Sequence, residues 1–214
     1  MKQLITKENN FTYLFIALIT IMFSSAVVAQ ANSTIADNIF LIIIISMLIV
    51  SIKSISLKLP IKIIIGIYIL SSILNTFTTY NFIPYILLST LLVFFIISYI
   101  SAYKQILFTG KIDRNKLIGS MSLYLLLGNI WTIIYLLIIL IDHNAFSGLD
   151  ITNWQQGFAR VGYYSFVTIT TLGYGDILPR NHIAEFFVSM EAIVGVFYIA
   201  IVVSSLISLK LQDD

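Results

Sequence analysis

The sequence predicts an all-α membrane protein with six transmembrane helices. Of its 214 residues, 59% are hydrophobic and only 10% are charged, and the mean hydropathy is +0.99. Soluble domains carry about 25% charged residues, so this composition indicates an integral membrane protein. A backbone in lipid must satisfy its own hydrogen bonds, and we therefore expect each spanning stretch to be a helix.

A span needs about 20 apolar residues to cross ~30 Å of hydrocarbon. Six stretches of the chain meet this length: about 11–30, 36–56, 61–80, 82–103, 121–141 and 183–209. The three prolines agree with these limits. Pro60 and Pro84 lie near predicted helix starts, where a missing N–H is harmless, and Pro179 lies between the last two spans.

The basic residues predict the orientation of these spans. Of the 12 Lys and Arg residues, only Arg160 and Arg180 lie in connections on one side of the predicted membrane. The other ten lie at the two ends of the chain and in the second and fourth connections. Cytoplasmic loops carry the excess of positive charge, so we expect both termini in the cytoplasm.

The first span has an alternative interpretation as a signal peptide. Lys2 and Lys7 precede an apolar run, and Ala29-Gln30-Ala31 resembles a cleavage site. We favour an uncleaved helix because the run is about 19 residues long, beyond the usual limit of about 15 for a signal peptide. Cleavage would leave the orientation of the later spans unchanged.

One motif lies between the last two spans, Thr170 to Asp176, which reads TTLGYGD. Gly173 and Gly175 can adopt positive φ without a Cβ clash, so the backbone between them can turn its carbonyls one way. Four such strands around an axis would replace the hydration shell of a potassium ion with carbonyl oxygens. The chain contains one GYG, so four chains would have to assemble around the ion.

This motif resembles the selectivity filter of the tetrameric potassium channels, whose usual filter reads TVGYGD; here Leu172 replaces Val. The resemblance extends over about residues 118–210, while before that only the number of helices matches. It implies a bacterial six-transmembrane subunit that conducts K+ as a homotetramer in the plasma membrane. It also implies a re-entrant pore helix and an extended filter between helices five and six.

The resemblance divides the chain into a four-helix N-terminal transmembrane region, 1–110, and a pore domain, 111–214. Within the pore domain it implies an outer helix at 118–141 facing lipid, a pore helix at about 156–170, the filter at 171–175 and an inner helix at 183–209. The fourth span has no regularly spaced Arg or Lys before Lys104. Because voltage sensing requires such charges, we do not expect the N-terminal region to be a functional voltage sensor.

The same resemblance assigns roles to residues of the pore domain. The K+ ligands are expected to be the carbonyls of the filter, with Asp176 at its outer mouth and Tyr163, Tyr164 and Thr170 as filter support. Tyrosines replace the tryptophans common in the family, and Val167 replaces the glutamate found in some bacterial channels. The expected ligand residues are Thr171, Leu172, Gly173 and Tyr174, with Gly175 completing the filter.

Two residues of the last span have more than one interpretation. Gly195 matches the family's gating-hinge glycine; the alternative is that a small residue is needed there for close packing. By the same resemblance, the side chains of Val196, Ile199 and Val203 would line the cavity of the pore. Glu191 is a carboxylate within the span, which is costly in lipid. We expect it behind the filter, bonded to Ser165 or Thr168, where its protonation would tune filter stability; a purely structural hydrogen bond is the alternative.

The sequence also excludes several function classes. Without cysteine, disulfides and thiolate metal sites are impossible, and the two histidines lie far apart. We expect no enzyme activity and no cofactor, and a net charge of +2 gives no reason to expect a nucleic-acid partner. The alternatives are a poorly selective cation channel, a transporter or a non-conducting structural subunit.

Overall fold

The structure is a computed structural model, and it describes residues 9–31, 33–55, 59–77, 82–107, 114–151 and 153–204. Seven α-helices make up most of this part of the chain. They are α1 (Asn10–Ala31), α2 (Thr34–Ile55), α3 (Leu59–Phe77), α4 (Ile83–Leu107), α5 (Arg114–Ile141), α6 (Trp154–Ile169) and α7 (His182–Phe197). A π-helical segment, η1 (Tyr198–Val203), continues α7.

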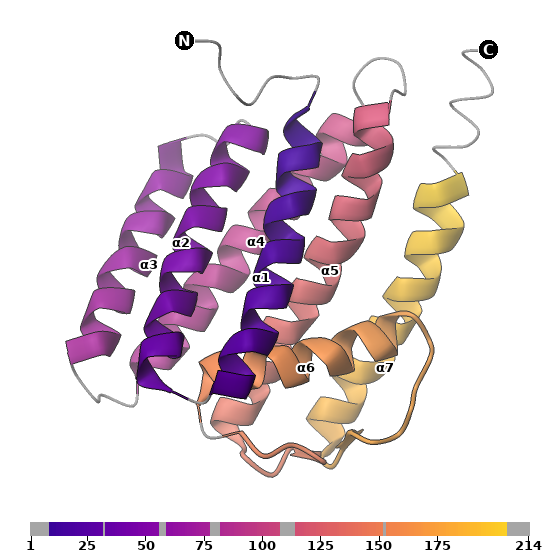
Figure 1. Ribbon diagram of the computed structural model, residues 1–214. Helices are drawn as coiled ribbons and strands as arrows, with labels where there is room; N and C mark the ends of the chain where they lie inside the picture. The colour runs from indigo at the N-terminus through magenta and orange to yellow at the C-terminus, as the bar shows by residue number, and fades with distance from the viewer. Residues whose placement is uncertain are drawn as a thin grey trace.

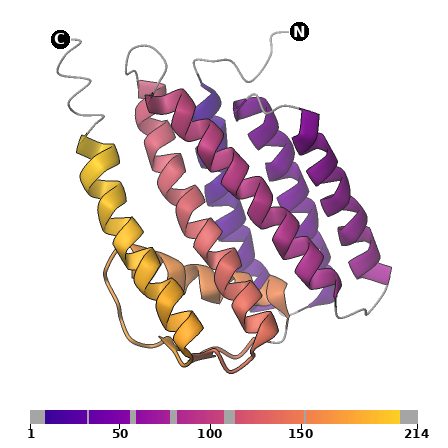
Figure 2. The same cartoon turned by 180° about the vertical axis from the view of Figure 1, so that it is seen from behind.

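Six of the helices run side by side, and α6 lies across them near one end (Figure 1). The start of α1 and the end of η1 lie at the opposite end of the bundle. Seen from behind, α4 runs diagonally between α3 and α5, with which it packs (Figure 2). Helix α1 packs against α2, α5 and α6, so the first helix contacts the short transverse helix directly.

In the part of the chain that the structure describes, α1, α2, α4, α5 and the α7–η1 segment are long and apolar enough to cross a membrane. Helix α3 has a shorter apolar stretch, Ile63–Asn75. The prediction of an all-α membrane protein is confirmed at this level. The helices α1 to α5 and α7 overlap the six predicted stretches, although their bounds differ from the predicted ones.

Two asparagines determine where the last two helices begin. The side chain of Asn153 accepts from the Gln156 amide at 2.9 Å, and that of Asn181 accepts from the Ala184 amide at 2.8 Å. Both are N-caps, which satisfy amides that the first helical turn leaves free. As a result α6 begins at Trp154, slightly before the expected start near residue 156.

A two-stranded antiparallel ribbon departs from the all-helical expectation. Strand β1 (Phe146–Ser147) pairs with β2 (Leu178–Pro179), with Phe146 opposite Pro179 and Ser147 opposite Leu178. The Arg180 amide extends the ribbon by donating to the Ala145 carbonyl at 2.8 Å. This ribbon joins the connection after α5 to the segment before α7.

The expectation that the helix at 118–141 faces lipid is wrong for most of its length. Trp131 is 8% exposed and Tyr135 is 0% exposed, although both were assigned to a lipid-facing helix. The physical reason is that α1 and α4 pack on α5, while α6 and α7 also contact it. Helix α5 is therefore central to the bundle.

The expected continuous inner helix at 183–209 is also only partly correct. The α-helical part ends at Phe197, and residues 198–203 are π-helical. The Tyr198 hydroxyl donates to the Ser120 carbonyl, and its ring lies 5.1 Å from that of Tyr124. Residues 205–209 lie outside the described part of the chain.

Candidate functional site

The segment after α6 is extended but tied to the end of that helix. The amides of Leu172 and Gly173 both donate to the Val167 carbonyl, at 3.0 and 3.2 Å, and the Thr171 amide donates to the Thr168 carbonyl at 2.9 Å. The Thr170 hydroxyl donates to the Phe166 carbonyl at 2.6 Å. These bonds fix the start of the TLGYGD segment relative to the C-terminal end of α6.

Every second residue of this segment has a positive φ. The angles are +61° at Thr171, +57° at Gly173 and +77° at Gly175. Alternation of right- and left-handed backbone turns successive N–H groups to one side of a strand, and the carbonyls then point to the other side. Among the described residues, Thr171 is the one non-glycine with positive φ. This conformation is strained for a β-branched residue, and strain of this kind concentrates at functional sites.

The segment lies at the surface of the chain. Leu172 is 55% exposed and Tyr174 is 65% exposed, and Gly173 and Gly175 have open space around their α-carbons. A strand with an uncovered face can be approached by an ion or by other copies of the same strand. It does not enclose an ion within one chain.

A polar and aromatic cluster surrounds the outer end of the segment. The Tyr163 and Tyr174 rings stack with centroids 6.4 Å apart and an interplanar angle of 10°. The Tyr163 hydroxyl also interacts electrostatically with the Asp176 carboxylate. Arg160 lies over the Tyr163 ring, with 5.6 Å between its Cζ and the ring centroid, and its Nη2 is 3.6 Å from Asp176 Oδ2. Asp176 is therefore paired with a basic side chain of α6.

The two adjacent tyrosines of α6 have different environments. Tyr164 is buried, and its ring lies 5.4 Å from that of Tyr135 and 5.5 Å from that of Phe146. Of these two tyrosines, Tyr163 is the one whose ring stacks on the TLGYGD segment in the described part of the chain. The two tyrosines expected as filter support are thus divided, with Tyr163 on the segment and Tyr164 in the bundle core.

Glu191 is fully buried and joins three helices. Its Oε2 accepts from the Tyr135 hydroxyl on α5 at 2.5 Å, and its Oε1 lies 2.6 Å from the Ser165 hydroxyl on α6. The Ser165 hydroxyl also lies 2.9 Å from the Gly128 carbonyl, so its single proton is shared between two acceptors. Thr168 donates instead to the Tyr164 carbonyl. No cationic side chain of the described residues forms an ion pair with Glu191.

Gly195 lies where α7 packs against the C-terminal end of α6. A β-carbon at this position would collide with the main-chain carbonyl of Ile169 and lie 2.8 Å from the Ile169 Cγ1. The same carbonyl accepts from the Tyr124 hydroxyl at 3.3 Å. This arrangement favours the packing interpretation of Gly195, and the departure from α-helical geometry begins three residues later, at Tyr198.

A comparison with protein-family models matches residues 123–210 to the family described as "Ion channel". The chain carries an ion channel domain. No curated protein and no solved structure matches the chain. The family is one of channels rather than enzymes, and it supports an ion channel function for this multi-pass membrane protein.

The ion channel domain includes all of the site residues named above. It begins within α5 and continues through α6, the TLGYGD segment, α7 and η1. Of the residues expected to line a cavity, Val196 and Ile199 are 54% and 53% exposed. The Val203 side chain lies outside the described part of the chain.

Two residues of the ion channel domain, Arg160 and Tyr135, were missed by sequence reasoning, and the backbone conformation of Thr171 was not foreseen. Arg160 was counted only for orientation, although its place three residues before Tyr163 predicts that the two share a helix face. Tyr135 was assigned to lipid, although a hydroxyl within a span needs a partner. The positive φ of Thr171 could not be predicted from its residue type, because threonine rarely adopts this conformation.

We expect Gly195→Ala to destabilise the ion channel domain by about 1–3 kcal/mol, the usual cost of overpacking. A main-chain carbonyl cannot rotate away as a side chain can, so α7 or α6 must move. Thermal unfolding of the purified protein checks this. Gly66→Ala is the control, since a β-carbon there meets nothing within 4 Å; equal melting temperatures for both variants would contradict the packing role.

Proposed function

We propose that this chain is the subunit of a homotetrameric, potassium-selective channel of the plasma membrane. The observation that carries the proposal is the alternation of positive φ at Thr171, Gly173 and Gly175. Carbonyls aligned along one side of a strand can replace the hydration shell of K+ when four strands surround the ion. The permeant ion is thus bound by main-chain oxygens of residues 171–174.

The proposal assigns residues 1–110 to a four-helix membrane region and residues 111–214 to the pore domain. All six apolar helices cross the bilayer in this arrangement, with both termini in the cytoplasm. The end of α6 carries a partial negative charge from its carbonyls, and the filter begins directly after it. A cation at the start of the filter is stabilised there without an acidic side chain.

A single strand cannot enclose an ion, so the filter requires other subunits. The exposed face of the filter and the exposed apolar side chains of α7 supply a surface for them. Phe186, Phe197 and Val196 are each at least 54% exposed in the single chain. In a tetramer these side chains pack against neighbouring subunits or lipid, or line the cavity.

Several residues support the filter in this proposal. Arg160 holds Asp176 at the outer mouth, Tyr163 stacks on Tyr174, and Thr170 anchors the inner end. Glu191 connects the pore helix α6 to α5 through Ser165 and Tyr135. Its protonation changes how many hydrogen bonds it accepts and so alters the position of α6 behind the filter. Gly195 acts by close packing at the end of α6 and as a hinge when α7 bends.

Ion selectivity is tested by reversal potentials of the purified protein in planar bilayers. With a tenfold K+ gradient and Na+ on the other side, we expect discrete single-channel currents that reverse near the K+ equilibrium potential, about 59 mV per tenfold gradient. Reversal near zero would indicate a poorly selective cation channel. Flux without unitary current steps would indicate a transporter, and no flux would indicate a structural subunit.

A further inference from the structure

Asp37 is a buried carboxylate that the proposed conduction mechanism does not use. It lies in the first turn of α2, within a predicted span, and is 6% exposed. No ion pair joins it to a basic side chain in the described ranges. A charged residue within a membrane span is costly and is by default a functional site, and a buried charge is weak evidence for stability. The contacts of Asp37 therefore indicate its role.

One hydrogen bond joins Asp37 to the start of α6. The Asn153 Nδ2 donates to the Asp37 Oδ2 at 3.0 Å. The same asparagine caps α6, because its Oδ1 accepts from the Gln156 amide at 2.9 Å. Asn153 thus bonds α2 with one end of its amide and α6 with the other. The carboxylate lies beside the N-terminal ends of both helices, where their dipoles favour a negative charge.

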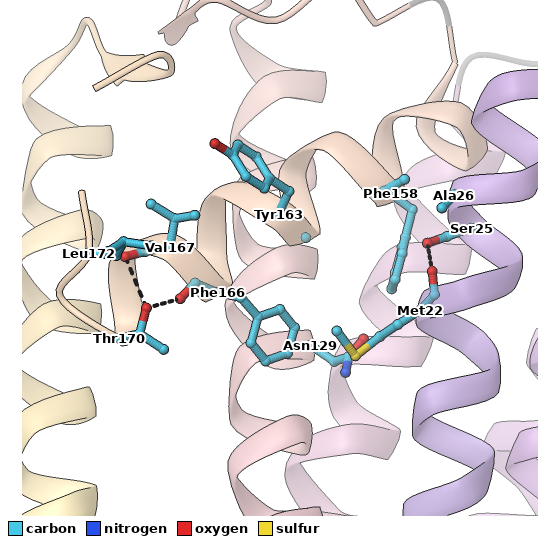
Figure 3. A pocket seen from close by; sticks show the side chains of 12 residues that line it. Met22, Ser25, Ala26, Asn129, Phe158, Tyr163, Phe166, Val167, Thr170 and Leu172 are labelled. Atoms are coloured by element: carbon cyan, nitrogen blue, oxygen red, sulfur yellow. Dashed lines mark hydrogen bonds between the residues drawn. The ribbon is translucent and has the colours of Figure 1, made fainter. Parts of the chain in front are cut away.

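Aromatic packing supplies a second contact between the same two helices. Phe40, one turn after Asp37, is fully buried, and its ring lies 5.5 Å from that of Phe158 and 6.4 Å from that of Trp154. Phe158 also extends from α6 toward α1, near Met22 (Figure 3). The first turns of α6 are therefore enclosed by α1 and α2, which both lie outside the ion channel domain.

The opposite end of α6 carries the filter. Thr170 and Leu172 lie at this end in Figure 3, and Phe158 lies near the other. The helix is 16 residues long, and the amides of Leu172 and Gly173 donate to its Val167 carbonyl. A helix is a rigid element that can carry a displacement from one end to the other. The start of α6 is thus connected mechanically to the filter.

The start of α7 has the same kind of cap, with one difference. Asn181 caps α7 with its Oδ1, and its Nδ2 donates to the Asp142 Oδ2 at 2.7 Å. Asp142 directly follows α5 and belongs to the ion channel domain. The start of α7 is therefore fixed from within that domain, whereas the start of α6 is fixed by a carboxylate from outside it.

We propose that Asp37 is a positioning residue for the filter. Through Asn153 it fixes the start of α6, and through α6 it fixes the place of the filter at the other end of that helix. This inference rests on the proposed function, and it gives the N-terminal region a role in conduction. Asp37 itself contacts neither the filter nor the ion.

The test uses the full-length protein in nanodiscs and planar bilayers, with Trp131→Phe as the common background. The chain has two tryptophans, so the remaining tryptophan is Trp154, which adjoins Asn153 and is 4% exposed. Quenching of its fluorescence by acrylamide reports whether the start of α6 stays packed. The open probability of single channels reports whether the filter stays conductive.

Asp37→Leu removes the acceptor and keeps a side chain of similar size. We expect stronger quenching of Trp154 and an open probability lower by about threefold to tenfold, the equivalent of one hydrogen bond. The reversal potential should not change. The melting temperature should not fall, because an apolar replacement of a buried charge is often neutral or stabilising. Asp37→Asn keeps an acceptor for Asn153 and should match the background in both readouts.

A pair swap tests the contact itself. Asn153→Asp keeps a good N-cap but brings two carboxylates together, which disfavours their charged forms, and we expect the same loss as for Asp37→Leu. Adding Asp37→Asn restores one donor and one acceptor in exchanged positions and should recover both readouts. Asn144→Asp, on an exposed asparagine after α5, adds the same charge and is the matched control.

Three outcomes would overturn the inference while leaving the proposed function intact. The first is quenching and open probability of Asp37→Leu equal to those of the background. The second is stronger quenching with an unchanged open probability, which would show that the start of α6 does not act on the filter. The third is a pair swap that recovers neither readout. Absence of unitary K+ current from the natural protein would instead refute the proposed function, and this inference with it.

Discussion

Replacing Gly173 with alanine should abolish potassium-selective conduction. Gly173 has φ of +57°, and a β-carbon there would meet nothing within 4 Å in the single chain. The effect is therefore conformational rather than steric. A left-handed conformation costs an alanine about 1–2 kcal/mol, and a tetramer would incur this cost four times, about 4–8 kcal/mol in one pore.

The measurement is single-channel recording of the purified variant, with the reversal potential in mixed K+ and Na+. We expect no unitary potassium current, or current without selectivity, from Gly173→Ala. Gly66→Ala is the matched control, because Gly66 has no positive φ and equally open surroundings. If Gly173→Ala conducted with unaltered selectivity, the aligned-carbonyl filter would be the wrong description of this segment.

Replacing Glu191 with leucine should destabilise the pore domain by about 1–3 kcal/mol, the cost of one buried donor left without its partner. The Tyr135 hydroxyl has no other acceptor among the described hydrogen bonds, whereas Ser165 can still donate to the Gly128 carbonyl. Adding Tyr135→Phe should recover part of this loss, because the orphaned hydroxyl is then removed as well. Thermal unfolding of the two single variants and the double variant measures this coupling.

Glu191→Gln tests the role of the proton at this site. Glutamine resembles the protonated acid in charge and shape, so the conductance of this variant should respond less to pH than that of the natural protein. Glu185→Gln is the matched control on the same helix, since Glu185 is half exposed and contacts only His182 through its side chain. Glu191→Gln with unchanged conductance and an unchanged pH response would exclude the proton from filter regulation.

Much of the molecule was predictable from local properties of the sequence. Long apolar runs predict helices because the bilayer leaves the backbone no other partner, and these helices occur where the runs do. The position of Glu191 beside Ser165 followed from the same reasoning, since a carboxylate within a span must face protein. The positive φ of Gly173 and Gly175 followed from the freedom of glycine.

Other features could not be predicted, because they depend on which faces of distant helices meet. Helix α5 is apolar on all sides, and hydropathy could not show that protein covers Trp131 and Tyr135. Each strand of the β1–β2 ribbon has two residues, and one of the four is a proline. Strands this short leave no signal in the sequence. Tyr163 and Tyr164 are adjacent in sequence, yet one stacks on Tyr174 and the other enters the core.

The sequence alone thus determined the presence of the helices and the backbone freedom of the TLGYGD segment, since hydropathy and φ preferences belong to single residues and their neighbours. Only the tertiary structure decided that Tyr135 and Ser165 share the Glu191 carboxylate and that Arg160 reaches Asp176. These contacts depend on the rotation and crossing of packed helices. Helix rotation is determined by the fit of many side chains at once, which no local pattern in an apolar sequence encodes.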